Sequence, residues 1–65
     1  MLDYRAFTVG RDGHFIGFEP LVCRDDAEAI EKASRLVGTC DVELWCGPRL
    51  VIRLIPPERR IPDSG

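Results

Sequence analysis

The sequence lacks any long apolar run, and this absence limits where the protein is expected to reside. No segment of the 65 residues approaches the roughly 18 to 20 consecutive apolar residues that a membrane-spanning helix needs. The first ten residues, MLDYRAFTVG, have neither the basic start nor the apolar core of a signal peptide. We therefore expect a cytoplasmic protein without a membrane segment.

Cysteine and histidine are too few and too widely spaced to predict a disulfide framework or a metal centre. The three cysteines, Cys23, Cys40 and Cys46, are an odd number, and the closest two have five residues between them. Structural zinc sites usually take their ligands in closer pairs. The single histidine, His14, directly follows a predicted turn, where it is expected to face solvent. We therefore predict no catalytic residue, no cofactor and no metal.

The net charge of −2 is too small to indicate a polyanionic partner, but the charges are unevenly distributed. Up to residue 48 the sequence has nine acidic and five basic residues. From there on, two acidic residues accompany four arginines, Arg49, Arg53, Arg59 and Arg60. Clustered arginines can contact phosphate groups. Nucleic-acid binding is therefore the alternative function, although no nucleic-acid-binding motif accompanies these arginines.

Residues 4–23 are predicted to form a β-hairpin, because Asp12-Gly13 can supply the positive φ angles of a two-residue type I′ turn. The implied pairs are Arg11 with His14, Val9 with Ile16, and Phe7 with Phe18. One face then carries Phe7, Val9, Ile16 and Phe18. The other face carries Tyr4, Ala6, Thr8, Phe15, Gly17 and Glu19. We expect the first set to lie toward the core and the second set to lie on the opposite face.

The segment RDDAEAIEKASRLVG, residues 24–38, predicts a helix. Asp25 is a good N-cap, Glu28 three residues later suits a capping box, and Gly38 suits the C′ position. Capping and the helix dipole explain the carboxylates of Asp25 and Asp26 without a catalytic role. A single apolar stripe indicates that the helix covers one side of a sheet. Its members are Ala29, Ile30, Ala33, Leu36 and Val37.

Residues 41–56 are predicted to form a second hairpin that turns at Gly47-Pro48 and stops at Pro56-Pro57. Its register has two alternatives. A three-residue loop pairs Glu43 with Arg53, whereas a two-residue loop sets Trp45 opposite Leu50 and Glu43 opposite Ile52. We favour the first, because it pairs opposite charges and alternates cleanly. Its inner face consists of Val42, Leu44, Cys46, Leu50, Ile52 and Leu54.

These elements predict an α+β fold of ββαββ order. The connection rules favour a four-stranded antiparallel sheet of order 2-1-3-4 with one helix on one face. Residues 1–55 form the single predicted domain. Residues 56–65, which are rich in proline and arginine, are predicted to form a mobile tail.

Several of the same residues carry a resemblance to a protein group. They are Tyr4-Arg5, Asp12-Gly13-His14, Asp25-Asp26 with Ala29-Ile30, and Glu43-Leu44-Trp45 with Gly47, Arg49, Val51 and Leu54. In this pattern, including the spacing E-L-W-x-G-x-R-x-V, the chain resembles short bacterial proteins of ββαββ order over residues 4 to 54. The resemblance implies a small cytoplasmic α+β fold, and it implies no activity or ligand.

The sheet face opposite the helix is the candidate interaction site. The residues predicted to line it are Tyr4, Phe15, Trp45, Val51 and Arg53. A helix about 10 Å wide also cannot cover a sheet roughly 15 to 19 Å across. We favour a homodimer that packs sheet to sheet about these aromatic residues, with another protein or a peptide as a further partner. Base stacking on single-stranded nucleic acid is less expected, since Glu19 and Glu43 make the surface acidic.

Overall fold

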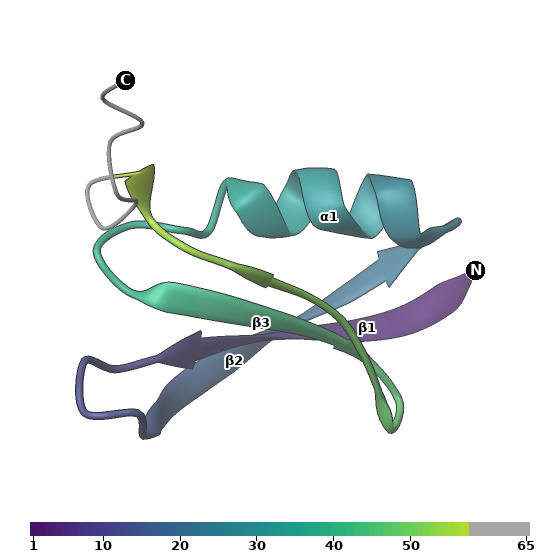
Figure 1. Cartoon of the computed structure of the whole chain (residues 1–65). Coiled ribbons are helices and arrows are strands. Elements are labelled where there is room, and N and C mark those ends of the chain that lie inside the picture. Colours follow the sequence, from purple (N-terminus) through teal and green to yellow (C-terminus); the bar gives the residue numbers. More distant parts are fainter. Residues whose placement is uncertain (58–65) are drawn as a thin grey trace.

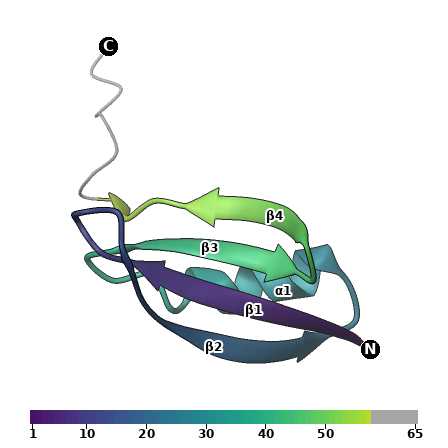
Figure 2. The same ribbon diagram turned by 90° about the horizontal axis from the view of Figure 1, so that it is seen from below.

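Four antiparallel strands form one sheet, and a single helix lies along one of its faces (Figure 1). The computed structural model describes residues 1–57. Its elements are β1 (Leu2–Val9), β2 (Phe15–Cys23), α1 (Asp26–Ser34), β3 (Asp41–Cys46) and β4 (Arg49–Leu54). The strand order is β2-β1-β3-β4, as predicted, so β1 and β3 are central and β2 and β4 are edges (Figure 2).

The turn between β1 and β2 differs from the predicted type I′ turn. A type I′ turn needs positive φ at both Asp12 and Gly13, but only Gly13 has one, at 88°. The Gly13 amide donates to the Gly10 carbonyl (3.0 Å), and the Gly10 amide donates to the His14 carbonyl (2.7 Å). The loop therefore has three residues, with glycine in the left-handed position that a type I turn followed by a G1 bulge requires.

A β-bulge in β2 then compensates for the extra loop residue. Thr8 pairs with Gly17 and Val9 pairs with Phe15, so Ile16 has no partner of its own. The predicted pairs Arg11 with His14 and Val9 with Ile16 are therefore wrong. The predicted pair of Phe7 with Phe18 is confirmed, because the longer turn and the bulge offset each other.

The hairpin of β3 and β4 combines the two predicted registers. Cys46 pairs with Arg49 across the two-residue turn Gly47-Pro48, and Trp45 pairs with Leu50. A register shift follows at Val51, after which Glu43 pairs with Arg53. The favoured three-residue loop is wrong, but its charge pair is confirmed. Leu50 is also not on the predicted inner face. It pairs with Trp45 and therefore lies on the same face as Trp45.

The helix begins as predicted and ends early. The Asp25 carboxylate accepts from the Glu28 amide at 2.9 Å, while the Glu28 carboxylate accepts from the Arg24 amide at 2.8 Å instead of from Asp25. At the other end the amides of residues 35, 36 and 37 bond to carbonyls three residues earlier. This tightening ends the helix at Ser34. Gly38 is therefore not the C′ residue.

The core lies between α1 and the face of the sheet that carries Tyr4, not the face that carries Phe7. The buried cluster consists of Tyr4, Ala6, Cys23, Ala29, Ala33, Val42 and Leu44. The predicted faces of the first hairpin are thus exchanged, except that Phe15, beyond the bulge, lies opposite the core as predicted. Ala6 pairs with Leu44 on β3, and its small side chain allows the alanines of α1 to approach the sheet. Phenylalanine at that place would hold the helix away.

The end of the described chain stays in contact with the domain. Pro56 is among the fully buried side chains, so the predicted tail of residues 56–65 does not leave the domain at its first residue. Residues 58–65 of that tail lie outside the described residues. Within residues 1–57, no helix is both long enough and apolar enough to cross a membrane.

Candidate interaction face

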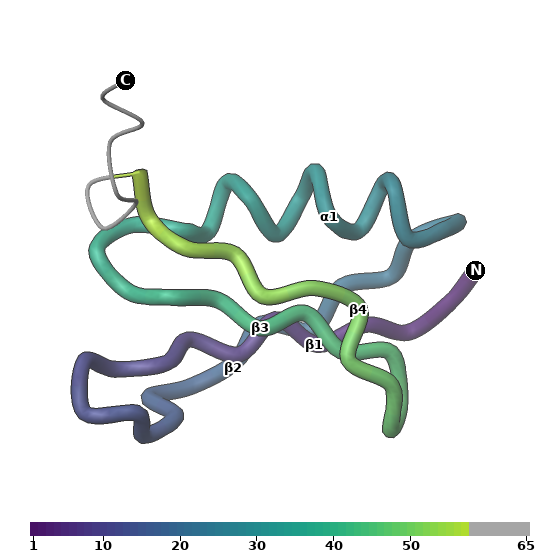
Figure 3. Tube along the Cα trace, viewed as in Figure 1, coloured from purple at the N-terminus to yellow at the C-terminus, as the bar shows by residue number. Residues whose placement is uncertain are grey.

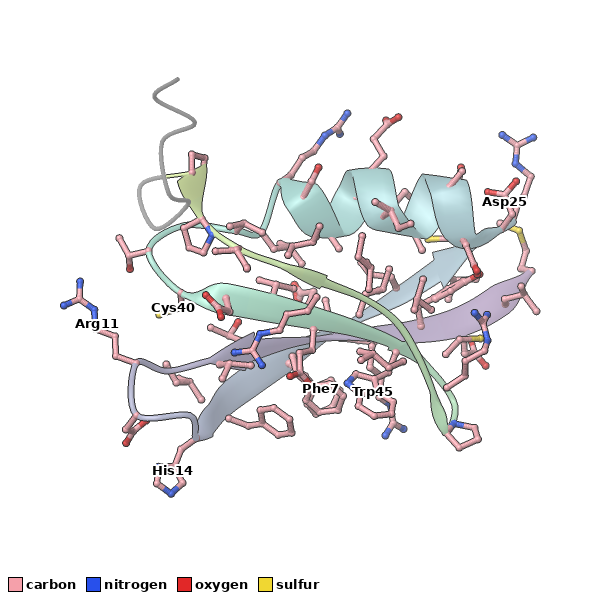
Figure 4. The ribbon with its side chains drawn as sticks, viewed as in Figure 1. Phe7, Arg11, His14, Asp25, Cys40 and Trp45 are labelled. Atoms are coloured by element: carbon pink, nitrogen blue, oxygen red, sulfur yellow. The ribbon has the colours of Figure 1, made fainter. Side chains whose placement is uncertain are left out.

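The sheet face turned away from α1 is open, and we call it the open face. The tube in Figure 3 shows that α1 lies on the other side of the sheet, and in Figure 4 Phe7 and Trp45 point away from the helix. Strand alternation and the pairing register define the residues of this face. They are Asp3, Arg5, Phe7, Val9, Phe15, Phe18, Pro20, Val22, Asp41, Glu43, Trp45, Leu50 and Arg53.

The open face holds four of the five aromatic residues of the chain. The Phe7 ring stacks on Phe15 with centroids 5.0 Å apart and contacts Phe18 at 5.5 Å. Phe15 is 56% exposed and Phe18 is 53% exposed. Large aromatic side chains are the residues that most often gain from burial. Here Phe15 and Phe18 are about half exposed, and Phe7 and Trp45 are partly exposed, on the side of the sheet away from α1.

The open face is concave around the centre of β1. The depression has a volume of about 460 Å³ and is lined by Asp3, Arg5, Phe7, Phe15, Trp45 and Gly47. Gly47 is the lining residue without a side chain, and a Cβ at that position would meet no heavy atom within 4 Å. A concave surface lined by aromatic groups with a few charges is typical of a binding surface.

Arg5 and Asp3 are the two charged residues that line this depression. The Arg5 guanidinium lies 5.4 Å from the centroid of the Phe18 ring, at cation–π distance. Within residues 1–57 neither Arg5 nor Asp3 forms an ion pair. The two side chains are two residues apart on β1 and therefore share the same face.

The other charges of the open face are held together by Arg53. Its guanidinium donates to Asp41 Oδ2 from Nε (3.1 Å) and Nη2 (2.8 Å), and to Glu43 Oε2 from Nη1 (3.1 Å). Asp41 is only 3% exposed, and its carboxylate raises the pKa of Arg53. Glu43 Oε1 in turn accepts from the Trp45 indole nitrogen at 3.1 Å. This chain of contacts fixes the orientation of Trp45.

Tyr4 belongs to a different cluster, on the helix side. Its hydroxyl donates to Asp26 Oδ1 at 2.6 Å, and Arg49 donates to both oxygens of the same carboxylate at 3.1 Å. The hydrogen bond to Asp26 raises the pKa of Tyr4 to about 12. Arg49, and then Tyr4, lower the pKa of Asp26. Tyr4 is 1% exposed, so its predicted place on the interaction face is wrong.

The remaining predicted interface residues divide between the two sides. Phe15, Trp45 and Arg53 lie on the open face, whereas Val51 lies at the register shift and packs partly against the core. Sequence reasoning missed Phe7, Phe18 and Arg5. The structure pairs Ala6 with Leu44, which places Arg5 and Phe7 on the side away from the helix. Alternation within the first hairpin carries no signal for that choice.

The cysteines and the histidine lie apart from the open face. All three cysteines are free, and Cys23 is buried beneath the helix. His14 is exposed in the first turn and faces Asp12, with Nδ1 2.9 Å from Oδ2. In the described part of the chain, His, Cys, Asp and Glu side chains do not gather in groups of three that could hold a metal ion.

The helix leaves one corner of its own side of the sheet uncovered. A shallow depression of about 280 Å³ lies there, lined by Ala6, Thr8, Ile16, Gly17, Phe18, Glu19 and Leu36. Leu36 is 42% exposed and Ile16 is 67% exposed. A single helix of nine residues therefore does not cover the whole face of the four-stranded sheet. This agrees with the expectation from the widths of the helix and the sheet.

Comparison of the chain with protein-family models, with curated proteins and with solved structures finds no match. The resemblance to short bacterial ββαββ proteins therefore stays a prediction. The function has to be argued from the open face itself.

Proposed function

We propose that this protein is a small, non-enzymatic interaction module that forms a homodimer by packing its open face against a second copy. The main support for this proposal is that Phe7, Phe15, Phe18 and Trp45 lie outside the core. Interface centres are enriched in aromatic residues and arginine, and this face has both. A 65-residue domain also buries only about 60% of the surface that its unfolded chain exposes, less than a larger domain does, so association would add stability that its core does not provide.

The edges of the sheet favour face-to-face packing over strand addition. Pro20 lies within the edge strand β2, opposite Arg5, and has no N–H to offer to a further strand. Both edge strands also contain a register shift, at Ile16 and at Val51. Bulges and prolines are the devices by which sheets avoid edge-to-edge pairing. The open face is therefore the better supported contact surface.

The size of the open face is compatible with a small interface. Four strands about 4.8 Å apart and roughly 20 Å long give a projected area on the order of 400 Å². Protruding side chains increase the accessible area toward the about 800 Å² per partner of a standard interface. We place this dimer in the cytoplasm, where three free thiols stay reduced.

Nucleic-acid binding is less well supported. Of the arginines expected to contact phosphate, Arg49 is bound to Asp26 and Arg53 is bound to Asp41 and Glu43. Arg59 and Arg60 lie outside the described residues. The open face also carries three carboxylates against two guanidinium groups, which opposes a polyanion.

Sedimentation equilibrium, combined with iodide quenching of the single tryptophan, tests the homodimer. We expect a dimer with a shielded Trp45, and Phe18→Ala should weaken the association by tenfold or more, the effect of about 1.4 kcal/mol. The matched control is Leu36→Ala, which shortens a similarly exposed apolar side chain on the helix side and should leave the association unchanged.

A wild-type monomer at high micromolar concentration with an accessible Trp45 would overturn the homodimer. Titration with single-stranded RNA and DNA at about 50 mM salt tests the alternative function, since electrostatic binding is strong at low salt. We expect no binding.

A further inference from the structure

We propose that the two copies of the homodimer are related by a two-fold axis that lies across the strands, level with Ala6 of β1. This inference rests on the proposed homodimer and names the residues that meet in it. Such an axis makes the two β1 strands antiparallel and lays β2 of one copy on β2 of the other. A residue level with Arg5 then faces a residue level with Phe7, and each contact forms twice.

The position of the axis follows from the extent of the open face along the strands. On β1 the face runs from Asp3, which pairs with Val22, to Val9, which pairs with Phe15. Ala6 is the midpoint of this run, so an axis at that level covers the whole face. An axis nearer to Asp3 leaves Phe15 beyond the strand of the other copy, and an axis nearer to Val9 leaves Val22 beyond it.

The residues that β2 contributes to the open face are all uncharged, and this axis sets them against one another. Phe18 of each copy lies over Pro20 of the other copy, and Phe15 lies over Val22. Phe15, Phe18 and Val22 are each more than half exposed, so the contact removes apolar surface from water on both copies. Phe7 stacks on Phe15 and contacts Phe18. The whole phenylalanine cluster is therefore covered.

The same axis gives Arg5 an aromatic surrounding. Its guanidinium lies 5.4 Å from the centroid of the Phe18 ring of its own copy, and in the dimer it faces the Phe7 ring of the other copy. A guanidinium is weakly hydrated and stacks on aromatic rings, so two rings suit this charge. Asp3 lies at the end of the contact, where interfaces are polar and hydrated.

The residues of β3 and β4 face one another across the axis in the same way. Trp45 lies over Glu43 of the other copy, because Trp45 is level with Arg5 and Glu43 is level with Phe7. Leu50 lies over Arg53 of the other copy. Glu43 and Arg53 stay paired within each copy at 3.1 Å, so neither charge needs a new partner. The indole of Trp45 is covered.

Other positions of the axis are less favourable. An axis across the strands level with Phe7 places Glu43 on Glu43 and Arg53 on Arg53. An axis parallel to the strands and along β1 places each charge of β1 on itself. An axis parallel to the strands between β1 and β3 lays Phe7 on Glu43 and Phe18 on Arg53. The negative face of a ring repels a carboxylate, and the uncharged row of β2 then loses its apolar cover.

Contacts between copies can be measured by NMR on wild-type protein mixed from isotope-labelled and unlabelled copies. Phe15 and Val22 are the decisive pair, since their partners Val9 and Asp3 are roughly 20 Å apart on an extended strand. We expect nuclear Overhauser effects between copies from Phe15 to Val22 and from Phe18 to Pro20. Effects from Phe18 to Arg53 would overturn the inference and indicate an axis parallel to the strands.

A double-mutant cycle tests the same contact through the dissociation constant. Phe15→Ala and Val22→Ala should each weaken the dimer, and the double variant should be at least about twofold tighter than the product of the two single effects predicts. The matched control combines Phe15→Ala with Leu50→Ala. Leu50 is 46% exposed on the same face but faces Arg53, so these two effects should multiply.

The outcomes separate the inference from the proposed function. A wild-type monomer would overturn the homodimer, and the axis with it. A wild-type dimer that Phe18→Ala weakens, but that shows no contact between Phe15 and Val22 of different copies and no coupling in the cycle, would overturn only the axis level with Ala6.

Discussion

The Tyr4 hydroxyl donates a 2.6 Å hydrogen bond to Asp26 Oδ1, which joins the central strand β1 to the first turn of α1. Arg49 binds the same carboxylate from the start of β4. Three elements that are distant in the sequence therefore meet at one acidic side chain. The contact also explains why the helix lies on the Tyr4 side of the sheet, since a buried phenol needs a hydrogen-bond partner.

The single tyrosine makes this contact measurable by titration. Its pKa is raised from 10.0 to about 12 in the folded protein, so the contact contributes stability that is present below pH 10 and is lost as the pH rises toward 12. We expect tyrosinate absorbance to appear near pH 12 in wild type and closer to pH 10 in Asp26→Asn. Equal midpoints in the two proteins would contradict the bond to the Asp26 carboxylate.

Two glycines should respond oppositely to alanine. Gly47 has a φ of 60° in the second turn, a conformation in which a Cβ is strained, so Gly47→Ala should cost about 1 kcal/mol. Gly17 lies in β2 without a positive φ, and a Cβ there meets nothing within 4 Å. Gly17→Ala should be neutral or slightly stabilising. Urea unfolding midpoints measure both, and equal losses in the two variants would argue against the turn geometry.

Arg53→Gln should destabilise the protein more than the loss of an ordinary surface arginine. Arg53 donates two hydrogen bonds to Asp41, which is 3% exposed, and one to Glu43. The control is Arg35→Gln, which removes an exposed helix pair worth about 0.5 kcal/mol or less. We expect the midpoint of urea unfolding to fall several times further for Arg53→Gln. Similar shifts would show that the Arg53 contacts are weak.

Pro20→Val should convert the β2 edge into a site for strand addition, because it restores an outward N–H on an exposed edge strand. We expect light scattering and thioflavin fluorescence to rise on storage. The control is the double variant Pro20→Val with Val22→Pro, which moves the proline two residues along the same edge and keeps an outward N–H missing. If light scattering and thioflavin fluorescence of Pro20→Val rise no more than those of wild type, Pro20 does not protect this edge.

The sequence predicts the elements, their order and the helix N-cap, because these depend on local chemistry. It does not predict the turn lengths. Asp12-Gly13 suits both a two-residue and a three-residue turn, and a bulge can absorb the difference, as it does at Ile16. The pair of Phe7 with Phe18 is therefore correct although the predicted turn is wrong. Likewise, Glu43 pairs with Arg53 across a shorter turn than the one favoured.

The sequence also does not decide which side of the first hairpin the helix covers. Both faces carry aromatic residues, so alternation alone leaves Tyr4 and Phe7 equivalent. The choice depends on the pairing of β1 with β3, which joins Ala6 to Leu44, and on the contact of Tyr4 with Asp26. Both are contacts between distant segments. As a result three of the five predicted interface residues lie on the open face, and Phe7 and Phe18 were predicted to lie toward the core although they lie on the open face beside Phe15.

The aromatic residues outside the core have a consequence for calorimetry. Unfolding raises the heat capacity in proportion to the apolar area that it newly exposes, by about 12 to 15 cal/mol/K per residue in ordinary domains. For 65 residues this predicts about 0.8 kcal/mol/K or slightly more. In a single copy the rings of Phe15 and Phe18 are already half hydrated, so its heat-capacity change falls below that value. Covering the open face restores the missing part, and the heat capacity of unfolding therefore reports whether the face is covered without any label or substitution.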